Sequence, residues 1–217
     1  MEKSRGFVTN HHVVNRTGGA AAWGSLIRSI EYTRGAAHFT HSDTPTPIPF
    51  DEILWSSVAE AHDITILSLK ELPRGVTPIP VRARAVDDVR AVTVLGHADG
   101  GALCFGNELL TALTGERDPL RDDRYLHYLT TTAGGCSGAP VLDWFDLSVI
   151  AVHHRGNIEP PAPTSRNRRR RGRNEPQSAA QAFNEGVRVA AIIAAIQRFP
   201  SGETEAQPEA RVDVRPS

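Results

Sequence analysis

The sequence predicts an all-β protein of the barrel or sandwich type that ends in one helix. Short runs of apolar or alternating residues recur with turn residues between them, which is typical of barrels and sandwiches. A proline-containing stretch from Pro73 to Arg84 separates these runs into two halves. One apolar stripe of helical period follows them and predicts the helix, formed by Val189, Ile192, Ile193 and Ile196.

The first half contains three candidate strands, at Phe7–Thr9, Ser25–Tyr32 and Ile64–Leu69. His11–Val14 follows the first of them and is expected to form a short loop or a helical turn. Alternating apolar and polar residues make Ile64–Leu69 the clearest strand of this half. The segment Glu52–Glu60 is either extended or helical, and a loop is predicted before it at Pro45, Pro47 and Pro49.

The second half has a stronger β signal. The Asp-Gly pair within His97–Gly101 predicts a turn between two strands. Pro160–Ser178 is polar and rich in arginine, so a mobile loop is expected there, and residues 201–217 are expected to be a disordered tail. The strands predicted in this half are Ala91–Gly96, Ala102–Phe105, Tyr125–Thr130, Pro140–Leu142 and Leu147–His153.

Size and composition limit the possible functions. A chain of 217 residues buries roughly 70% of its unfolded surface, so it needs no disulfide or metal for stability. The formal net charge of −1 shows no overall bias toward nucleic acid or membranes. No stretch reaches the roughly 18 apolar residues of a membrane span. The first residues contain no signal-peptide core, so a cytoplasmic monomer is expected, or a secreted protein if the true start lies upstream.

One glycine-rich stretch, Thr131–Pro140, carries a single serine. Glycines allow a tight loop that directs two backbone N–H groups to one point beside the Ser137 hydroxyl. That arrangement suits a nucleophile with an oxyanion hole. Gly-Ser-Gly also occurs in ordinary turns, so the stretch needs a general base and a carboxylate elsewhere in the chain.

Candidates for both partners occur upstream of the serine. His12 follows the first strand, where a loop can present an imidazole beside a cleft, although a surface histidine is the simpler interpretation. Asp63 directly precedes the strand Ile64–Leu69 and can reach into a cleft, or it is an ordinary aspartate at a strand start.

Taken together, these three motifs resemble a known family. Thr9–Val14, Asp63–Leu67 and Gly135–Pro140 are similar to the catalytic motifs of the chymotrypsin-like serine peptidases and occur in that family's order. The nearest branch is the bacterial glutamyl-endopeptidase-like, or trypsin-like, peptidases. Residues 6 to 199 take part in the resemblance. Three further segments resemble that branch: a pocket strand at Val149–His154, the entry to the C-terminal helix at Asn184–Arg188, and a hairpin at Gly96–His97.

The resemblance implies a fold of two six-stranded-type antiparallel β-barrels. Residues 1–78 would form the first barrel and residues 79–200 the second barrel with the helix. Only eleven residues precede His12, so the first barrel is expected to lack strands at its N-terminus. A catalytically impaired, truncated peptidase fold that acts as an interaction module is therefore the alternative function.

The resemblance also implies the roles of individual residues. His12 would be the general base, Asp63 would orient its imidazole, and Ser137 would attack the carbonyl of a protein or peptide substrate. The backbone N–H groups of Gly135 and Ser137 would form the oxyanion hole.

Two other positions suggest the specificity of the peptidase. In glutamate-specific relatives, positions like Thr132 and His153 hold a hydroxyl and a histidine that meet the substrate carboxylate. These two groups can bind a carboxylate through charge-assisted hydrogen bonds. Cleavage after Glu, and less readily after Asp, is therefore predicted.

The two cysteines form no disulfide framework. Cys136 stands where trypsin has an aspartate that pairs with its freed N-terminus, so no such activation is expected. A small core filler is the favoured role of Cys136, a redox role is the alternative, and nothing in the sequence supports pairing with Cys104.

Other candidate sites carry weaker signals. His38 and His41 are two possible zinc ligands where three or four are needed, so no metal is expected. No phosphate-binding glycine loop occurs, and no cofactor is predicted. Six arginines within Arg166–Arg173 are the only candidate for binding nucleic acid, and a solvated loop is the favoured interpretation.

Overall fold

The computed structural model describes residues 6–14, 36–37, 39, 47–59, 61–72, 75–85, 91–106, 112–113, 120, 122–159 and 182–202. By its internal contacts the chain divides into two compact units. The first comprises residues 1–77 and 194–217, and the second comprises residues 78–193. The predicted strand Ser25–Tyr32, the arginine-rich segment Arg166–Arg173, and His38 and His41 lie outside the described residues.

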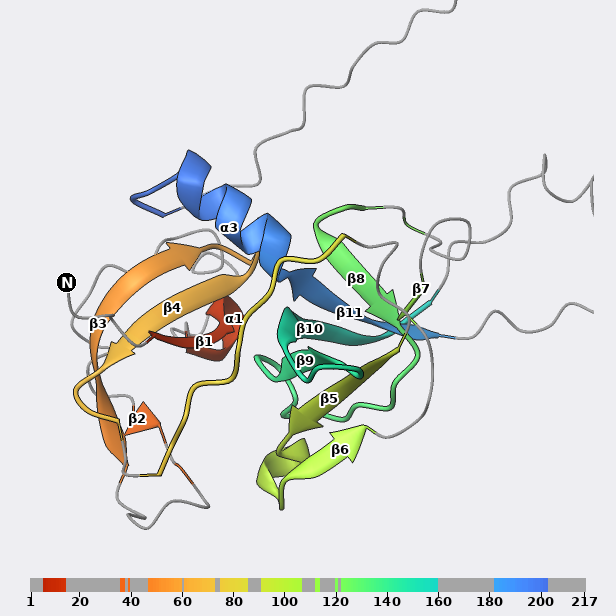
Figure 1. Ribbon diagram of the computed structural model, residues 1–217, viewed down its shortest axis with the longest axis horizontal. Helices are drawn as coiled ribbons and strands as arrows, with labels where there is room; N and C mark the ends of the chain where they lie inside the picture. The colour runs from red at the N-terminus through yellow and green to blue at the C-terminus, as the bar shows by residue number, and fades with distance from the viewer. Residues whose placement is uncertain are drawn as a thin grey trace, which may run out of the picture. The chain divides into compact units, whose positions relative to one another are not determined.

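The first unit contains a four-stranded antiparallel sheet in the order β1-β4-β3-β2 (Figure 1). The helical turn α1, predicted as a loop or helical turn, directly follows β1. The elements are β1 (Gly6–Asn10), α1 (His11–Val14), β2 (Ala36–Ala37), β3 (Ile48–Ser57) and β4 (Ile64–Leu69).

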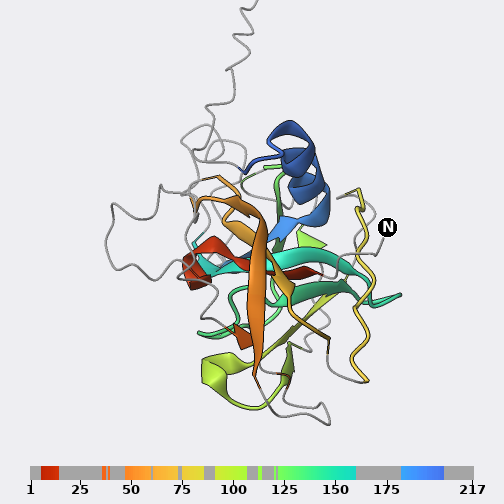
Figure 2. The ribbon, with the colours of Figure 1, turned by 90° about the vertical axis from the view of Figure 1, so that its left-hand side faces the viewer.

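β3 is longer than the sequence predicts. In Figure 2 this strand lies toward the viewer. It includes Pro49, one of the three prolines that the sequence assigned to a loop, and it ends at Ser57. Its pairing with β4 shifts register on both sides of Ile53. β3 therefore stays paired with β4 from Phe50 to Ser57, with two bulge-like irregularities. Phe50 and Leu67 form the small core of this sheet, with the Phe7 ring 5.3 Å from that of Phe50.

The second unit contains a seven-stranded antiparallel sheet in the order β6-β5-β9-β10-β11-β8-β7. The predicted turn between β5 and β6 is a 3₁₀ turn at Ala98–Gly100. The strands are β5 (Val92–Gly96), β6 (Cys104–Gly106), β7 (Ala112–Leu113), β8 (Tyr125–Tyr128), β9 (Pro140–Asp143), β10 (Val149–Ile158) and β11 (Phe183–Arg188).

β11 occupies the residues that the resemblance places at the entry to the C-terminal helix. Asn184, Glu185 and Gly186 show no apolar alternation, yet they lie between β10 and β8 and pair with both. Backbone pairing on two sides fixes a strand that side-chain pattern does not reveal.

The helix α3 (Val189–Arg198) follows β11 directly and confirms the predicted helix. Val189, Ile192 and Ala195 are buried, whereas Ile193 is 42% exposed. Ile193 was therefore wrongly included in the buried stripe, and the small side chain of Ala195 takes its place. All-β sheets with one main helix confirm the predicted fold class.

Candidate active site

Strand pairing brings His12 and Asp63 together in the first unit. β1 runs antiparallel to β4, with Asn10 opposite Ile64. The residues that follow β1 therefore lie beside the residue that precedes β4. α1 begins at the end of β1, so His12 projects from this helical turn next to Asp63.

Two hydrogen bonds join these residues. His12 Nδ1 lies 2.5 Å from Asp63 Oδ2, and the His12 backbone N–H donates to Asp63 Oδ1 over 2.9 Å. The Asp63 side chain is 1% exposed, whereas that of His12 is 26% exposed. A buried carboxylate with both oxygens engaged orients the imidazole, which itself reaches the surface.

The backbone of Asp63 is also held firmly. Its φ of 52° lies in the left-handed region, which aspartate tolerates better than most residues. Its N–H donates to the Val58 carbonyl, and its own carbonyl accepts from the His11 N–H and Asn10 Nδ2 at 3.0 and 3.1 Å. Backbone hydrogen bonds on both sides thus maintain a conformation that is otherwise uncommon.

The neighbouring histidine has a different environment. His11 is 1% exposed, and its Nδ1 lies 3.1 Å from the Ser56 hydroxyl. Ser56 in turn lies 3.1 Å from the Thr65 hydroxyl, which links β3 to β4. His11 therefore belongs to the interior of the sheet, whereas the imidazole of His12 lies against Asp63.

The Ser137 loop in the second unit is shaped by its backbone. Gly135 and Gly138 have φ values of 86° and 83°, which favour glycine. The Gly138 N–H donates to the His153 carbonyl over 3.0 Å, and the Ala139 N–H donates to the Cys136 carbonyl over 2.9 Å. The second bond closes the loop on itself, and the first, together with the His153 N–H donating to the Ala139 carbonyl over 2.8 Å, anchors its C-terminal side to β10.

Gly135 is constrained twice. A Cβ atom at this position would lie 3.0 Å from the Asp99 nitrogen and 3.1 Å from the His97 carbonyl oxygen. The Asp99 N–H donates to the Gly134 carbonyl over 2.7 Å, which packs the 3₁₀ turn against the loop. Only glycine meets both the positive φ and this close approach.

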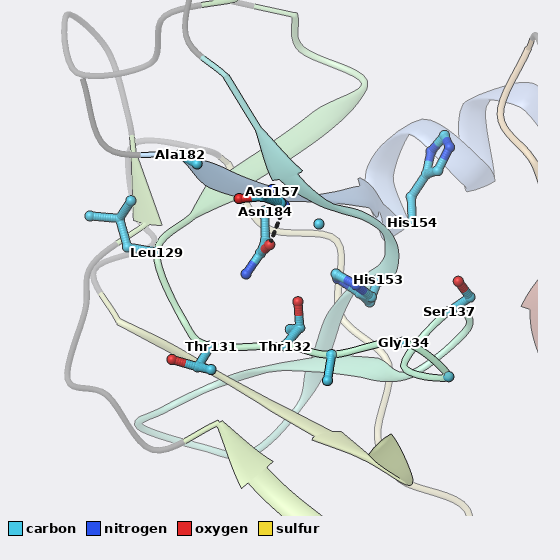
Figure 3. A pocket seen from close by; sticks show the side chains of 13 residues that line it. Leu129, Thr131, Thr132, Gly134, Ser137, His153, His154, Asn157, Ala182 and Asn184 are labelled. Atoms are coloured by element: carbon cyan, nitrogen blue, oxygen red, sulfur yellow. Dashed lines mark hydrogen bonds between the residues drawn. The ribbon is translucent and has the colours of Figure 1, made fainter. Parts of the chain in front are cut away.

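A pocket of about 450 Å³ opens beside this loop. It brings together four residues that the sequence singled out, Thr132, Gly135, Ser137 and His153 (Figure 3). The lining consists of Leu129, Thr131, Thr132, Ala133, Gly134, Gly135, Ser137, His153, His154, Gly156, Asn157, Ala182 and Asn184.

The family model described as "Trypsin-like peptidase domain" matches residues 3–152, more than half of the chain. The chain belongs to the trypsin-like peptidase domain family. Membership supports a serine peptidase, a hydrolase that acts on protein or peptide substrates. No curated protein sequence matches the chain.

Solved structures show the fold of this trypsin-like peptidase. The HtrA-type protease AlgW with a tripeptide is 14% identical with a TM-score of 0.53, and the match covers 92% of this chain and 53% of AlgW. M. tuberculosis Rv3671c, a serine-to-alanine mutant in its inactive form, is 16% identical with a TM-score of 0.47, covering 90% and 76%. The AlgW likeness and the family together show the chymotrypsin-like fold.

The pocket of this trypsin-like peptidase has a feature that the sequence did not reveal. The Tyr128 hydroxyl lies 2.6 Å from His153 Nδ1, and both residues are buried. Burial, with smaller contributions from Glu185 and Cys136, raises the pKa of Tyr128 well above its ordinary value. The phenol therefore stays protonated at physiological pH and can act as a donor to Nδ1.

Two further wall residues were also missed. A Cβ atom on Gly156 would lie 3.0 Å from Asn184 Oδ1 and 3.1 Å from Thr132 Oγ1, so glycine keeps the pocket open. Asn184 donates to the Thr130 carbonyl and accepts the Asn157 N–H over 3.1 Å. A glycine and an asparagine inside strands were the only signals available for these roles.

Next to the pocket, Glu185 lies between two buried histidines. Its Oε2 is 3.0 Å from His127 Nε2, and its Oε1 is 3.7 Å from His154 Nδ1. The His154 side chain points away from His153 and from the pocket centre (Figure 3). Within the described ranges, no group of three or more His, Cys, Asp or Glu residues is placed to hold a metal. In the same ranges, no helix is long and apolar enough to cross a membrane.

Proposed function

We propose that this chain is a serine endopeptidase in which His12, Asp63 and Ser137 act as the catalytic triad. His12 takes the proton of the Ser137 hydroxyl as the oxygen attacks the scissile carbonyl, and then gives it to the leaving amine. Water hydrolyses the resulting acyl-enzyme by the same steps, with His12 again as the base. Peptide bonds are hydrolysed without a cofactor.

One observation carries this proposal: the 2.5 Å contact between His12 Nδ1 and the buried carboxylate of Asp63. A carboxylate at Nδ1 holds the proton on that nitrogen and leaves Nε2 as the basic atom. It also stabilises the imidazolium that forms when Ser137 is deprotonated. A non-catalytic interaction module would not need this arrangement and is not favoured.

The Ser137 loop supports the second part of the proposal. The N–H groups of Cys136, Gly138 and Ala139 donate to backbone carbonyls of the second unit. Among the described residues, no such backbone bond is made by the N–H groups of Gly135 and Ser137. We assign the Gly135 and Ser137 N–H groups to the oxyanion hole. Removing one such donor typically lowers the rate about 10²–10³-fold.

The pocket supports a preference for an acidic residue before the scissile bond. Thr132 and His153 both line it, and a threonine hydroxyl together with an imidazole N–H can donate hydrogen bonds to a carboxylate. We therefore propose cleavage after Glu, and less readily after Asp, as in the bacterial glutamyl-endopeptidase-like branch. The longer glutamate side chain suits a pocket of about 450 Å³ better.

A fluorophosphonate probe tests the nucleophile directly. The full chain should be labelled, Ser137→Ala should not, and the exposed turn variant Ser201→Ala should be labelled like the wild type. Labelling of Ser137→Ala, or no labelling of a folded wild-type chain, would refute the serine peptidase assignment.

A peptide library tests the specificity separately. Cleavage should occur mainly after Glu, and Thr132→Val should lower kcat/KM for Glu substrates about tenfold, the effect of one lost hydrogen bond to a charged group. Cleavage mainly after Arg or Leu would rule out the acidic preference while leaving the nucleophile assignment intact.

A further inference from the structure

Both cysteines of the chain meet at one glycine. Cys104 Sγ lies 3.1 Å from the Gly96 carbonyl oxygen. Cys136 Sγ lies 3.1 Å from the point where a Cβ atom of Gly96 would stand. The Cys104 sulfur therefore contacts the backbone of Gly96, and the Cys136 sulfur borders the space that a side chain at residue 96 would fill.

Strand register places both sulfurs on the same face. Cys104 on β6 pairs directly with Gly96 on β5. Side chains of paired residues in neighbouring strands project to the same face of a sheet, with Cβ atoms about 5 Å apart. The Cβ direction of Gly96 leads to Cys136, so the Cys104 side chain also projects to the face on which Cys136 lies.

These two contacts limit the distance between the sulfur atoms. Because the oxygen and the Cβ position of one residue are about 3 Å apart, the two sulfur atoms lie within roughly 9 Å of each other at most. A change of χ1 rotamer moves a cysteine sulfur by about 3 Å. Cys104 is at the end of a short hairpin and exposed, so it has room to turn toward Cys136.

The two cysteines differ in access and in position. Cys104 is exposed to solvent, whereas Cys136 is 4% exposed and belongs to the core of the second unit. Cys136 stands between Gly135 and Ser137. Any force on its side chain therefore acts on the loop that carries the nucleophile.

We propose that Cys104 and Cys136 are a redox pair, and that their disulfide lowers the reactivity of Ser137 by displacing the loop that carries it. The formation of the disulfide is independent of the catalytic assignment, whereas its effect on activity rests on the proposed function. The small-filler role of Cys136 in the reduced protein is compatible with this second role.

A low-molecular-weight disulfide such as glutathione disulfide is the oxidant. The Cys104 thiolate attacks one sulfur of this disulfide, so a mixed disulfide forms and one glutathione thiolate leaves. The Cys136 thiolate then attacks the Cys104 sulfur and expels the second glutathione. The two protein thiols are oxidised, one glutathione disulfide is reduced to two thiols, and the two protons of the cysteines end on glutathione.

The disulfide would act through the backbone. A bond to Cys104 pulls residue 136 toward the β5–β6 hairpin, and the loop has little freedom because the Asp99 N–H already holds the Gly134 carbonyl over 2.7 Å. The adjacent N–H groups of Gly135 and Ser137 must then reorient. Since losing one oxyanion donor lowers rates about 10²–10³-fold, oxidation should reduce fluorophosphonate labelling at least about tenfold.

The experiment treats the full chain with glutathione disulfide or with dithiothreitol. Free thiols are alkylated in denaturant, and peptides are identified by mass spectrometry. The labelling rate is measured on the same samples. Cys104→Ser is the matched variant, because it removes the pair at an exposed position and leaves the Ser137 loop unchanged.

The proposal expects a Cys104–Cys136 cross-linked peptide, loss of both free thiols and a labelling rate that dithiothreitol restores. Cys104→Ser should keep its labelling rate in oxidant. Glutathione that remains on Cys104 while Cys136 stays alkylatable would overturn the redox pair. A cross-linked chain that is labelled as fast as the reduced chain would overturn the switch. If no sample is labelled, the proposed function fails, and the thiol analysis still decides whether the pair forms.

Discussion

The two halves of the proposed triad, one in each unit, are built in different ways. In the first unit, His12 and Asp63 are joined by side-chain hydrogen bonds at the meeting point of two paired strands. In the second unit, the Ser137 loop depends on positive φ values at Gly135 and Gly138 and on backbone hydrogen bonds to β10.

This difference predicts how each half fails. The first half depends on the chemistry of one carboxylate, so an isosteric substitution should damage activity and leave the fold intact. The second half depends on backbone shape, so even one added methyl group should affect both activity and stability. Substitutions in the two halves therefore separate chemical from conformational effects.

Asp63→Asn should produce the largest effect. Asparagine keeps the shape and tolerates a φ of 52°, but its amide opposes the Nδ1–H tautomer that His12 needs. We expect kcat to fall about 10⁴-fold with little change in Tm. Kinetics on a peptide substrate test this, with the exposed Asp51→Asn on β3 as control. A loss of less than tenfold would remove Asp63 from the proposed triad.

Gly135→Ala should lower the rate about 10²–10³-fold and reduce the free energy of unfolding by about 1–3 kcal/mol. Its Cβ atom would press on the Asp99 nitrogen at 3.0 Å and would strain a φ of 86°. Gly75→Ala is the matched control, because φ is 79° there and nothing lies within 4 Å of the added carbon. Kinetics and urea unfolding of both variants should show strain in each but loss of activity only at Gly135. Equal activity of the two would contradict the backbone role of the loop.

Tyr128→Phe should have the next largest effect, because the second unit also contains a side-chain contact beside its pocket. Loss of the hydroxyl beside His153 Nδ1 should reduce kcat/KM for Glu substrates about tenfold and the stability by about 1–2 kcal/mol. The effect should be absent for Tyr125→Phe, whose ring lies 5.9 Å from that of His154. An unchanged preference for Glu in Tyr128→Phe would show that the phenol does not position the imidazole.

Asp146→Asn should produce the smallest effect, on stability alone. Hydrogen bonds from the Ser148 side chain and backbone, followed by one from Arg84, lower the pKa of Asp146 to about 2. A depressed pKa means that the ionised form stabilises the fold above the ordinary value of 3.8, and that this contribution is lost as pH falls toward 2. The variant should therefore have a lower Tm than the wild type at pH 7, with a difference that disappears near pH 2. Thermal unfolding at several pH values measures this, and a constant difference would contradict it.

Local patterns in the sequence predicted a large part of the structure. Alternation identified the strand Ile64–Leu69, helical spacing identified α3, and the Asp-Gly pair identified the turn before β6. The order of the motifs at His12, Asp63 and Ser137 indicated the family that the comparison shows. These features depend on residues close together in the chain, so they can be read without knowing which strands pair.

Pairing between distant strands decided the rest. β11 is a strand because β10 and β8 satisfy its backbone on both sides, although its residues show no β pattern. The same pairing places Asn184 on the pocket wall opposite Gly156. Neither residue carries a local signal of this role.

The motifs and most local elements could therefore be predicted from the sequence, because glycine conformation and apolar periodicity act over a few residues. The tertiary structure was needed to show that the Asp63 carboxylate is buried against His12 and that Tyr128 contacts His153. It also decided that Cys104 and Cys136 share Gly96. Such contacts depend on strand register, in which a shift of one residue turns each side chain to the other face.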